Sequence, residues 1–528
     1  SSKTSLQENE FIKMDFEWNP LYGVHTFNML GFIYIYPDPV YKEFILKSKD
    51  STKPESHTFD ELVDNSDRIK LKFPNERCRI RNQFGNSRRL IEEEASTVYP
   101  YIHEIVFVLY CEFLDHKMKY GTEIEKNIYN GMTIEDFVER LLVKRCVSFY
   151  GKKNRYLLRS GEIGNGNFKT IGTDKEQPPL VMRDYLTLDE IKLASFICIS
   201  SCSQNKITIG ICGIQLDKKG LMDYQDIILG KSQNCKENGY GPKPKEIVSD
   251  ELEESFHKRS IWNNFYSIKS TIYGQIDRKK LRGSTYRSPK VLKRYVKIEN
   301  ATEFYDCDAL EKRYSSILSM ILIESNARAK KLGKMAYIWI NRNLMGLESM
   351  QEWQEDYFFR MFVSVSISLF RQLYSVFCIH LENFPENCWV KDDTLLNNNN
   401  EDDPYFWNKH PNKGIKIRLS SERVKKEAFQ DDDNFVYIST YSASPNSFPG
   451  NEFWMRKISS NKESTAYLAC HSYISELHNP LVNSNMVSGK NLHIASEYGG
   501  VVHISEYCSL ELENRYKTYP ENVPESES

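Results

Sequence analysis

The order of apolar and polar residues changes along the chain, and after residue 184 short apolar runs alternate with amphipathic segments. Runs rich in β-branched and aromatic residues predict strands, and they lie at residues 196–200, 207–214, 336–341, 374–381, 435–440, 492–495 and 501–504. Two segments, 309–331 and 350–373, carry apolar residues three or four positions apart and predict helices between these strands. Strands that alternate with helices form a parallel or mixed sheet covered by helices. We therefore predict an α/β domain over residues 185–512.

Residues 1–184 lack this alternation and predict an accessory region. Apolar residues at helical spacing, from Ile102 to Phe113 and from Phe137 to Leu142, predict helices from about residue 91 to residue 149. Residues 161–179 are rich in glycine and proline, which is typical of a linker or a surface loop. At the other end, residues 513–528 are polar and acidic, so we expect a flexible tail.

Composition narrows the classes of partner. The 528 residues hold 70 Lys and Arg against 72 Asp and Glu, a formal charge of -2, so no excess of positive charge favours nucleic acid or an anionic membrane. The most apolar stretch, residues 361–381, is interrupted by serines and by Arg371, so no membrane span is predicted. The 12 cysteines include no Cys-x-x-Cys pair, which favours thiols in a reducing, cytosol-like compartment. We expect no metal site and no cofactor.

One turn has the composition of a phosphate-binding loop. Residues 444–454, Ser-Pro-Asn-Ser-Phe-Pro-Gly-Asn-Glu-Phe-Trp, follow the predicted strand at 435–440 and precede a helix that a capping box, Ser460-Asn-Lys-Glu463, would start. Backbone N–H groups and the dipole of a following helix can hold an anionic group at such a turn. A glycine such as Gly450 lets the backbone approach a ligand closely. An ordinary connection between a strand and a helix is the alternative.

Polar residues also stand where two predicted strands end. Asn341, Arg342 and Asn343 replace an apolar run at the end of one strand, and Glu382 follows another. In open α/β sheets, ligands bind outside the carboxyl ends of the strands. We therefore expect these residues to line a crevice, with Glu382 as its carboxylate. Strand capping and a solvated glutamate are the alternatives.

Two short segments, His493 to Glu497 and His503 to Glu506, each pair a histidine with a glutamate. A catalytic dyad is one interpretation. Both segments lie in strand-like runs in which every second side chain points to solvent, so we favour ordinary strand residues. The chain contains no His-Glu-x-x-His, no Walker loop and no Gly-x-Ser-x-Gly motif.

Several segments taken together resemble one known family. The matching residues are Leu188-Asp-Glu-Ile191, Ile199-Ser-Ser201, Gly220-Leu-Met-Asp-Tyr-Gln225, Glu237-Asn-Gly-Tyr-Gly241, the segment from Glu324 to Tyr337, Asn446-Ser-Phe-Pro-Gly-Asn-Glu-Phe-Trp454 and Ser475-Glu-Leu-His-Asn-Pro480. They are similar to the MavL-like macrodomains, atypical relatives of poly(ADP-ribose) glycohydrolase that remove ADP-ribose from arginine and occur among effectors injected by intracellular bacteria. The resemblance covers residues 187–485 and is closest in the last two segments.

The resemblance implies a macrodomain-like mixed sheet flanked by helices, and an enzyme that hydrolyses the N-glycosidic bond between ADP-ribose and an arginine side chain. Asp223 then serves with Glu382 as a carboxylate of the site, and Gly450 belongs to the loop around the diphosphate. The residues expected to contact ADP-ribose are Gln225, Asn238, Gly239, Asn341, Arg342, Asn343, Ser444, Asn446, Phe448, Gly450, Asn451, Glu452 and Phe453. The expected partners are ADP-ribose and an arginine-ADP-ribosylated protein, ubiquitin or another host protein, after secretion by a bacterium into the host cytosol or an organelle.

The chain departs from the family pattern at three places. An Asn- and Gly-bearing loop is expected after Ser201, but the chain has Cys202-Ser-Gln-Asn-Lys206. Ser444 stands at the position of an acidic residue, and Arg342-Asn-Leu-Met-Gly346 replaces a glycine-rich run. A second hypothesis is therefore open, a macrodomain that binds ADP-ribose or an ADP-ribosylated protein without turnover. A third is an interaction protein that contacts a partner through its N-terminal region and the Asn-rich segment 397–403.

Overall fold

The computed structural model describes residues 24–29, 32–69, 79–83, 85–150, 155–165, 168–203, 206–211, 216–217, 220–221, 295–297, 304–342, 365, 369, 372–384, 410–420, 433–442, 448–450, 475–496 and 500–516. Within these ranges, no helix combines the length and the apolar character that crossing a bilayer requires. The helix expected at 350–373 falls outside them, apart from residues 365, 369, 372 and 373.

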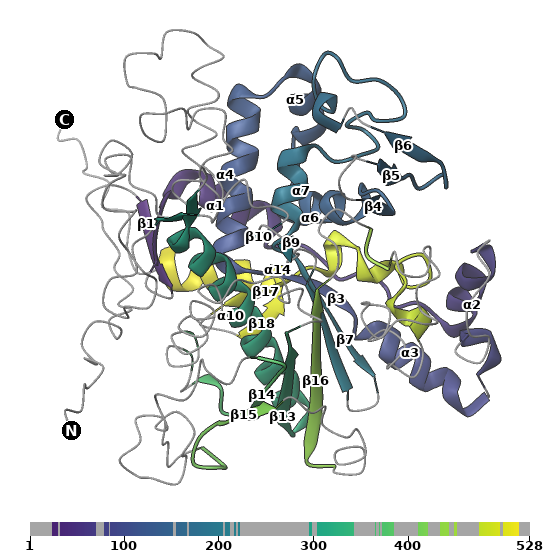
Figure 1. Ribbon diagram of the computed structural model, residues 1–528, viewed down its shortest axis with the longest axis vertical. Coiled ribbons are helices and arrows are strands. Elements are labelled where there is room, and N and C mark those ends of the chain that lie inside the picture. The colour runs from purple at the N-terminus through teal and green to yellow at the C-terminus, as the bar shows by residue number, and fades with distance from the viewer. Residues whose placement is uncertain are drawn as a thin grey trace, which may run out of the picture.

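A nine-stranded mixed sheet forms the centre of the molecule (Figure 1). Its strands lie side by side in the order β15 (Lys416–Ser420), β14 (Val376–Glu382), β13 (Met335–Asn341), β16 (Phe435–Ser442), β8 (Lys206–Ile211), β7 (Cys198–Ser203), β3 (Tyr99–His103), β17 (His493–Ser496) and β18 (Gly500–His503). The first five run parallel, whereas β7 is antiparallel to both of its neighbours and β18 is antiparallel to β17. Every strand expected from the apolar runs is in this sheet, so the prediction of an α/β fold is confirmed.

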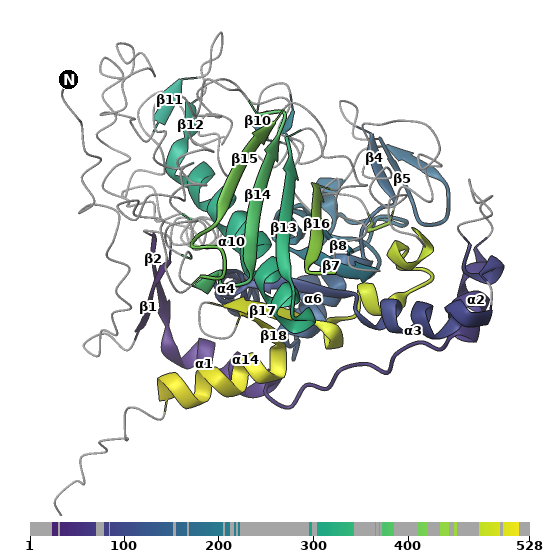
Figure 2. The same cartoon turned by 90° about the horizontal axis from the view of Figure 1, so that it is seen from below.

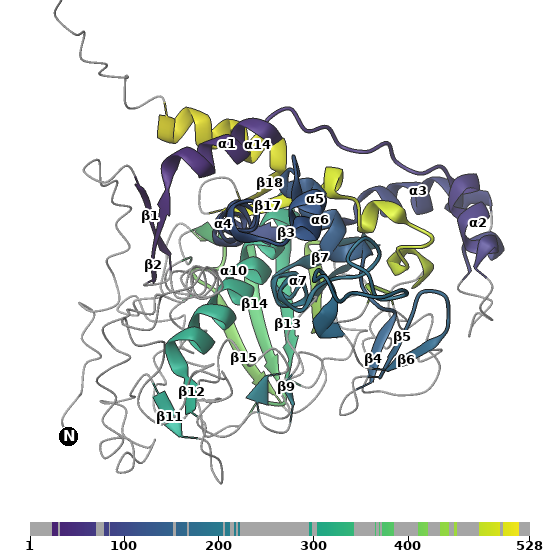
Figure 3. The ribbon, with the colours of Figure 1, turned by 90° about the horizontal axis from the view of Figure 1, so that it is seen from above.

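One face of the parallel strands is apolar. Ile338 of β13 pairs in register with Ile379 of β14 and Ile438 of β16, and all three are buried in the main hydrophobic core. Helix α10 (Cys307–Leu332) crosses this face (Figures 2 and 3) and adds apolar side chains such as Ile321. Burial of this apolar surface is the main contribution to the stability of the fold.

The opposite face of the same strands is aromatic and polar. Residues that pair in register between neighbouring strands share a face, and the alternation along β13 therefore separates two kinds of side chain. The successive rows on this face are Tyr337 with Cys378 and Tyr437, then Trp339 with His380 and Ser439, then Asn341 with Glu382. All of these side chains except Tyr437 are buried, so the aromatic and titratable side chains of these rows gather on one face.

The N-terminal residues belong to the same core. Strand β3 lies between β7 and β17, and α4 (Glu104–Tyr120), which follows it, is buried along most of its length. The sheet therefore takes strands from both sides of the boundary expected at residue 184. Ile102 is in β3 and not in the helix to which its spacing assigned it, because α4 begins after His103, whose ring accepts a hydrogen bond from the N–H of Ile105.

Several helices begin at a threonine. In these capping boxes, a threonine side chain and an acidic side chain three residues later each accept a hydrogen bond from the other's backbone N–H. Such boxes start α2 (Phe59–Arg68), α5 (Glu123–Tyr129), α6 (Ile134–Val143) and α7 (Leu188–Ala194).

Helix α3 (Arg88–Ser96) precedes β3. Helix α1 (Asp38–Ser48) lies beside α14 (Ile504–Glu511), so two distant parts of the chain pack together (Figure 3).

Smaller sheets surround the central one. They pair β1 (Val24–Met29) with β2 (Phe32–Pro37), β4 (Ser148–Tyr150) and β6 (Ile163–Asn165) with β5 (Arg155–Leu157), β9 (Leu216–Asp217) with β10 (Gly220–Leu221), and β11 (Tyr295–Lys297) with β12 (Phe304–Asp306). Short helical turns include η13 (Ser475–His478), η14 (Ser484–Met486) and η15 (Gly489–Asn491), and η16 (Leu512–Tyr516) continues α14.

Candidate functional site

Glu382 is the last residue of β14, at the edge of the sheet where the parallel strands end. Its register partner on β13 is Asn341, and the N–H of Arg342 donates to the carbonyl oxygen of Glu382 at 3.1 Å. The next residue, Asn383, has a φ of 63°, a left-handed conformation that asparagine adopts more readily than most residues. Three of the predicted residues, Asn341, Arg342 and Glu382, are therefore assembled at one point of the carboxyl edge.

The carboxylate of Glu382 is buried, with 5% of the residue exposed. Its Oε2 accepts a hydrogen bond from the indole N–H of Trp339. Trp339 lies on β13, two residues before Asn341, the register partner of Glu382. Such a donor offsets part of the cost of removing a carboxylate from water. The indole in turn stacks on the ring of Tyr437, with ring centroids 6.2 Å apart. The site therefore contains a carboxylate in a defined orientation.

His380 lies on the same face as Glu382, two residues earlier on β14. Its Nδ1 is 3.1 Å from the hydroxyl of Tyr337, and its Nε2 has no hydrogen-bond partner within the described ranges. Burial, together with the nearby guanidinium of Arg418, lowers the pKa of His380 to about 4. Burial raises the pKa of Tyr337 to about 12. At pH 7 both of these side chains are therefore neutral, and the charge beside them is that of Arg418, the register partner of His380 on β15.

The turn predicted to bind phosphate is described at Phe448, Pro449 and Gly450. Gly450 has a φ of 81°, and a Cβ atom on it would lie 2.5 Å from Cδ of Pro480, so the position requires glycine. The N–H of Phe448 donates to the carbonyl of Cys146 at 2.6 Å and therefore binds protein. The other residues expected in this loop lie outside the described ranges: Ser444, Asn446, Asn451, Glu452 and Phe453.

The short helix η13 connects this turn to the sheet. His478 Nδ1 is 3.3 Å from the hydroxyl of Ser201 on β7, and Gly450 lies against residues 478–480. Glu476 is buried and accepts a hydrogen bond from the hydroxyl of Ser66, in the N-terminal region. Segments that carry the family resemblance therefore meet in space around η13. Among the described residues, the contacts of this turn are with Cys146 and residues 478–480, and those of Glu382 are with Trp339 and Arg342.

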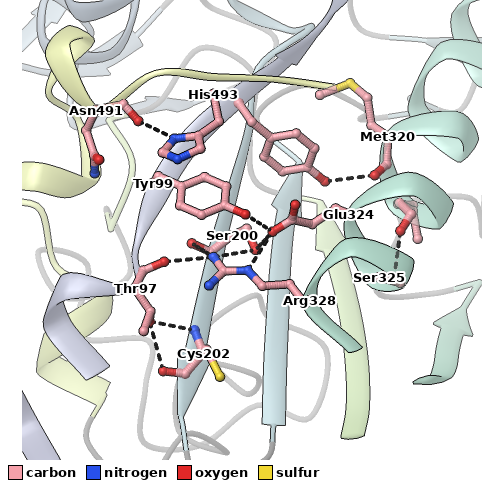
Figure 4. Close-up of polar contacts among 12 residues, drawn as sticks. Thr97, Tyr99, Ser200, Cys202, Met320, Glu324, Ser325, Arg328, Asn491 and His493 are labelled. Carbon is pink, nitrogen blue, oxygen red and sulfur yellow. Dashed lines mark hydrogen bonds and ion pairs between the residues drawn. The ribbon is translucent and has the colours of Figure 1, made fainter. Parts of the chain in front are cut away.

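A second polar cluster lies inside the molecule, between α10 and the sheet (Figure 4). Oε1 of Glu324 accepts hydrogen bonds from the hydroxyls of Tyr99 and Ser200, each at 2.5 Å, and from Nε of Arg328 at 2.7 Å. The guanidinium of Arg328 also donates to the carbonyl of Thr97 at 2.7 Å and lies 4.3 Å from the centroid of the Tyr99 ring. Because Glu324 is completely buried, we interpret this cluster as a clamp that joins α10 to β3 and β7.

His493 and His503 are both buried. His493 stacks on Tyr99, with ring centroids 3.8 Å apart, and its Nδ1 is 2.8 Å from the carbonyl of Asn491 (Figure 4). Burial holds the pKa of His493 well below its ordinary range. Nε2 of His503 is 2.8 Å from the carbonyl of Lys490. For β17, the expectation that alternation points every second side chain to solvent is wrong, because every residue of this strand is buried.

The remaining predicted residues are not among those that the structure describes. Asp223, Gln225, Asn238, Gly239 and Asn343 lie outside the described ranges, so their roles stay predictions.

The first departure from the family pattern has a structural counterpart at Cys202. The hydroxyl of Thr97 accepts a hydrogen bond from the N–H of Cys202 at 3.1 Å, and its single proton faces two carbonyl acceptors, that of Glu94 at 2.7 Å and that of Cys202 at 3.1 Å. The N–H of Cys202 is therefore already paired within the protein.

Sequence reasoning missed Trp339, Tyr337 and His380, which accompany Glu382 on the aromatic and polar face. The sequence signal that points to them is the segment Tyr337-Ile-Trp-Ile-Asn341, in which aromatic or polar residues alternate with isoleucine. The run reads as one continuous apolar strand because tyrosine and tryptophan count as apolar in such patterns.

Comparison with known proteins assigns this chain to a family. The family model described as ADP-ribosylhydrolase MavL-like matches residues 60–205 and 200–510. Two proteins of Drosophila melanogaster are similar over most of the chain. ADP-ribosylarginine hydrolase CG2909 is 32% identical over 464 residues, which cover 83% of this chain and 86% of that protein. ADP-ribosylarginine hydrolase CG3568 is 32% identical over 468 residues, which cover 84% and 87%. These matches confirm the predicted resemblance and the prediction of a hydrolase, and the chain belongs to the MavL-like family of ADP-ribosylhydrolases.

Proposed function

We propose that this protein hydrolyses the N-glycosidic bond that joins ADP-ribose to an arginine side chain. The family supports the proposal, and so do the two Drosophila relatives, both of which are named ADP-ribosylarginine hydrolases. The single observation of the structure that carries it is the buried carboxylate of Glu382, held beside Asn341 and Arg342 at the carboxyl edge of the parallel strands.

Hydrolysis of such a bond passes through an oxocarbenium-like state at C1 of the ribose. Water adds to C1 as the C–N bond breaks, and the proton lost by the water balances the one that the departing guanidine requires. A carboxylate that accepts this proton, or that orients the water, accelerates such a step by about 100-fold to 10,000-fold. We assign this role to Glu382. By the family resemblance, Asp223 supplies a second carboxylate.

The rest of the substrate needs fixed contacts so that C1 stays aligned with the carboxylate. Arg342 follows Asn341 directly, and its planar guanidinium suits the oxygens of a diphosphate. The turn at Gly450 is the second candidate for the diphosphate, because a backbone without a Cβ allows close approach. A diphosphate anchored in this way would hold the sugar in place during bond cleavage.

The experiment compares the wild-type protein with Glu382→Gln and Glu506→Gln. Glu506 is an exposed glutamate of α14 and serves as the matched control. Each protein is incubated with an arginine-ADP-ribosylated protein, and released ADP-ribose is quantified by chromatography. We expect Glu382→Gln to lose at least about 100-fold in rate and Glu506→Gln to match the wild type. Absence of release by the wild type at high enzyme concentration rejects the proposed function.

A second function is supported by the backbone of Cys202. Because Thr97 pairs the N–H of Cys202, this donor is already used within the protein, at the start of the segment where the family is expected to grip the ribose. Recognition of ADP-ribose without turnover is therefore the competing proposal. Calorimetry with ADP-ribose separates the two, since binding without release favours recognition alone, and release favours the enzyme.

The hypothesis of an interaction protein requires a different experiment from simple truncation. Deletion of the residues before 184 removes β3 from between β7 and β17, so loss of a partner after such a deletion would report unfolding. Substitution of exposed side chains in the N-terminal region, with the strand kept, is the informative design.

The identity of the modified protein and the cellular setting stay predictions from the family resemblance. Ubiquitin or another host protein is the proposed carrier of the modified arginine, and secretion by a bacterium into a host cell is the proposed setting. ADP-ribosylated ubiquitin, offered in competition with another arginine-ADP-ribosylated protein, tests the first of these by the relative rates of release.

A further inference from the structure

The two large aromatic residues of β13 on the polar face make the same kind of contact with β14. Tyr337 pairs in register with Cys378, yet its hydroxyl reaches His380, one step further toward the carboxyl edge. Trp339 pairs with His380, yet its indole N–H reaches Glu382, again one step further. Both side chains therefore lean toward the carboxyl edge, and the upper one ends on the carboxylate of the candidate site.

A stack of rings holds the indole in this orientation. Tyr437 of β16 stacks on Tyr337, with ring centroids 6.0 Å apart and planes 19° apart, and on Trp339, with centroids 6.2 Å apart and planes 28° apart. Trp339 itself is 2% exposed. An indole that is buried and stacked in this way loses little freedom when it donates its N–H, so the direction of the donor is fixed before any substrate arrives.

The backbone around Glu382 is fixed as well. The N–H of Arg342 bonds the carbonyl of Glu382 at 3.1 Å, and Asn383 leaves the strand in a left-handed conformation with a φ of 63°. Left-handed non-glycine residues are uncommon and occur disproportionately at functional sites. The backbone that carries the carboxylate is thus held in place, and one of the two carboxylate oxygens accepts the hydrogen bond of the indole. Among the described residues, no hydrogen bond to the other oxygen, Oε1, is found, so Oε1 is the one left for water or ribose.

We propose that Trp339 is a positioning residue, which holds Oε2 of Glu382 through its indole N–H and thereby presents Oε1 to the reacting centre. The inference rests on the proposed function, because it assigns Glu382 a part in the reaction. It adds a residue that touches the carboxylate and not the substrate.

The test uses Trp339→Phe, which keeps a stacked ring and removes the donor. Tyr337→Phe is the matched control, because it removes the equivalent hydrogen bond one step lower on the same strand and face. A hydrogen bond to a charged group is worth about 10-fold to 100-fold, so kcat of Trp339→Phe should fall by about this factor, with KM within about twofold of the wild type. Loss of a donor favours the protonated form of a carboxylate, so the acidic limb of the pH–rate profile should move to higher pH. Tyr337→Phe should keep both kcat and the pH profile.

An isosteric variant separates the donor from the shape of the indole. Replacement of Trp339 by 3-benzothienylalanine keeps the bicyclic ring and exchanges the N–H for sulfur, so the loss of kcat and the shifted pH limb should persist although the packing is retained. The double variant Trp339→Phe with Glu382→Gln should be no slower than Glu382→Gln alone, because the two residues act as one unit.

The outcomes distinguish this inference from the proposed function. If the wild type releases no ADP-ribose, the proposed function fails and Trp339 has no reaction to serve. If the wild type is active and both Trp339 variants keep its kcat and its pH profile, as Tyr337→Phe should, the positioning role is overturned and the proposed function stands.

Discussion

Replacement of Gly450 by alanine tests how closely the turn approaches η13. The change adds one methyl group at a residue whose φ is 81°. The added Cβ would lie 2.5 Å from Cδ of Pro480 and 3.3 Å from the carbonyl oxygen of His478. Neither neighbour is the free end of a flexible side chain, so the backbone of the turn must move.

The magnitude follows from two contributions. The left-handed conformation costs an L-residue about 1 to 2 kcal/mol, and overpacking of a filled site costs about 1 to 3 kcal/mol. We therefore expect Gly450→Ala to lower the free energy of unfolding by about 2 to 5 kcal/mol. A displaced turn should also weaken the binding of ADP-ribose, because the backbone no longer approaches the diphosphate in the same place.

Gly333→Ala is the matched control. Gly333 directly follows α10 and has a φ of 65°, and a Cβ there meets no atom within 4 Å, so only the conformational cost of about 1 to 2 kcal/mol applies. Urea unfolding gives the stabilities, and calorimetry with ADP-ribose gives the affinities. Equal losses of stability in Gly450→Ala and Gly333→Ala would refute the reasoning about the close approach. Unchanged ADP-ribose affinity in Gly450→Ala would remove this turn from the site.

Two further predictions concern the buried charges. Glu324→Gln leaves the guanidinium of Arg328 without its carboxylate inside the core, so it should lower the free energy of unfolding by about 3 to 5 kcal/mol. Replacement of both Glu324 and Arg328 by methionine should cost much less. Urea unfolding of the wild type and the two variants checks this order, and an equal cost for the single and the double variant would contradict it. His380 has a pKa of about 4 in the folded protein against 6.5 as the reference value. Below pH 6.5 the unfolded chain therefore binds a proton that the folded protein does not, and stability should fall as the pH drops from 6.5 to about 4, by up to about 3 kcal/mol from this residue. The loss should be smaller in His380→Phe, and urea midpoints that fall equally in both proteins between pH 7 and pH 4.5 would show that His380 does not contribute.

The strands of the sheet could be predicted because most of them are short apolar runs flanked by polar residues. Strand β3 could not, because Ile102 continues the helical spacing of α4 and because Pro100 lies inside it. Its place between β7 and β17 depends on tertiary pairing, which no local pattern records. The central position of β3 is also the reason why the N-terminal region packs into the same core as the rest of the chain.

The site was predictable where a topological rule applies. Glu382 and Asn341 follow from the rule that polar residues at the carboxyl ends of parallel strands face a crevice, and the structure pairs them in register. Trp339 was not predictable, because its role depends on the register between β13 and β14 and on the stacking of Tyr437, neither of which is visible along the chain. The need for glycine at 450 was suggested by the turn, but its partner Pro480 lies 30 residues away and is known from the structure alone.

The most direct measurement of the central claim is a single-turnover reaction followed by mass spectrometry of the intact substrate. An arginine-ADP-ribosylated protein is mixed with an excess of the wild-type protein or of Glu382→Gln, and the mass of the substrate is recorded with time. The wild type should restore the unmodified mass with free ADP-ribose as the second product, and Glu382→Gln should leave the modified mass in place over the same interval. A substrate that keeps its ADP-ribose in the presence of the wild type, or loses it equally fast with Glu382→Gln, would contradict the assignment of the reaction to this carboxylate.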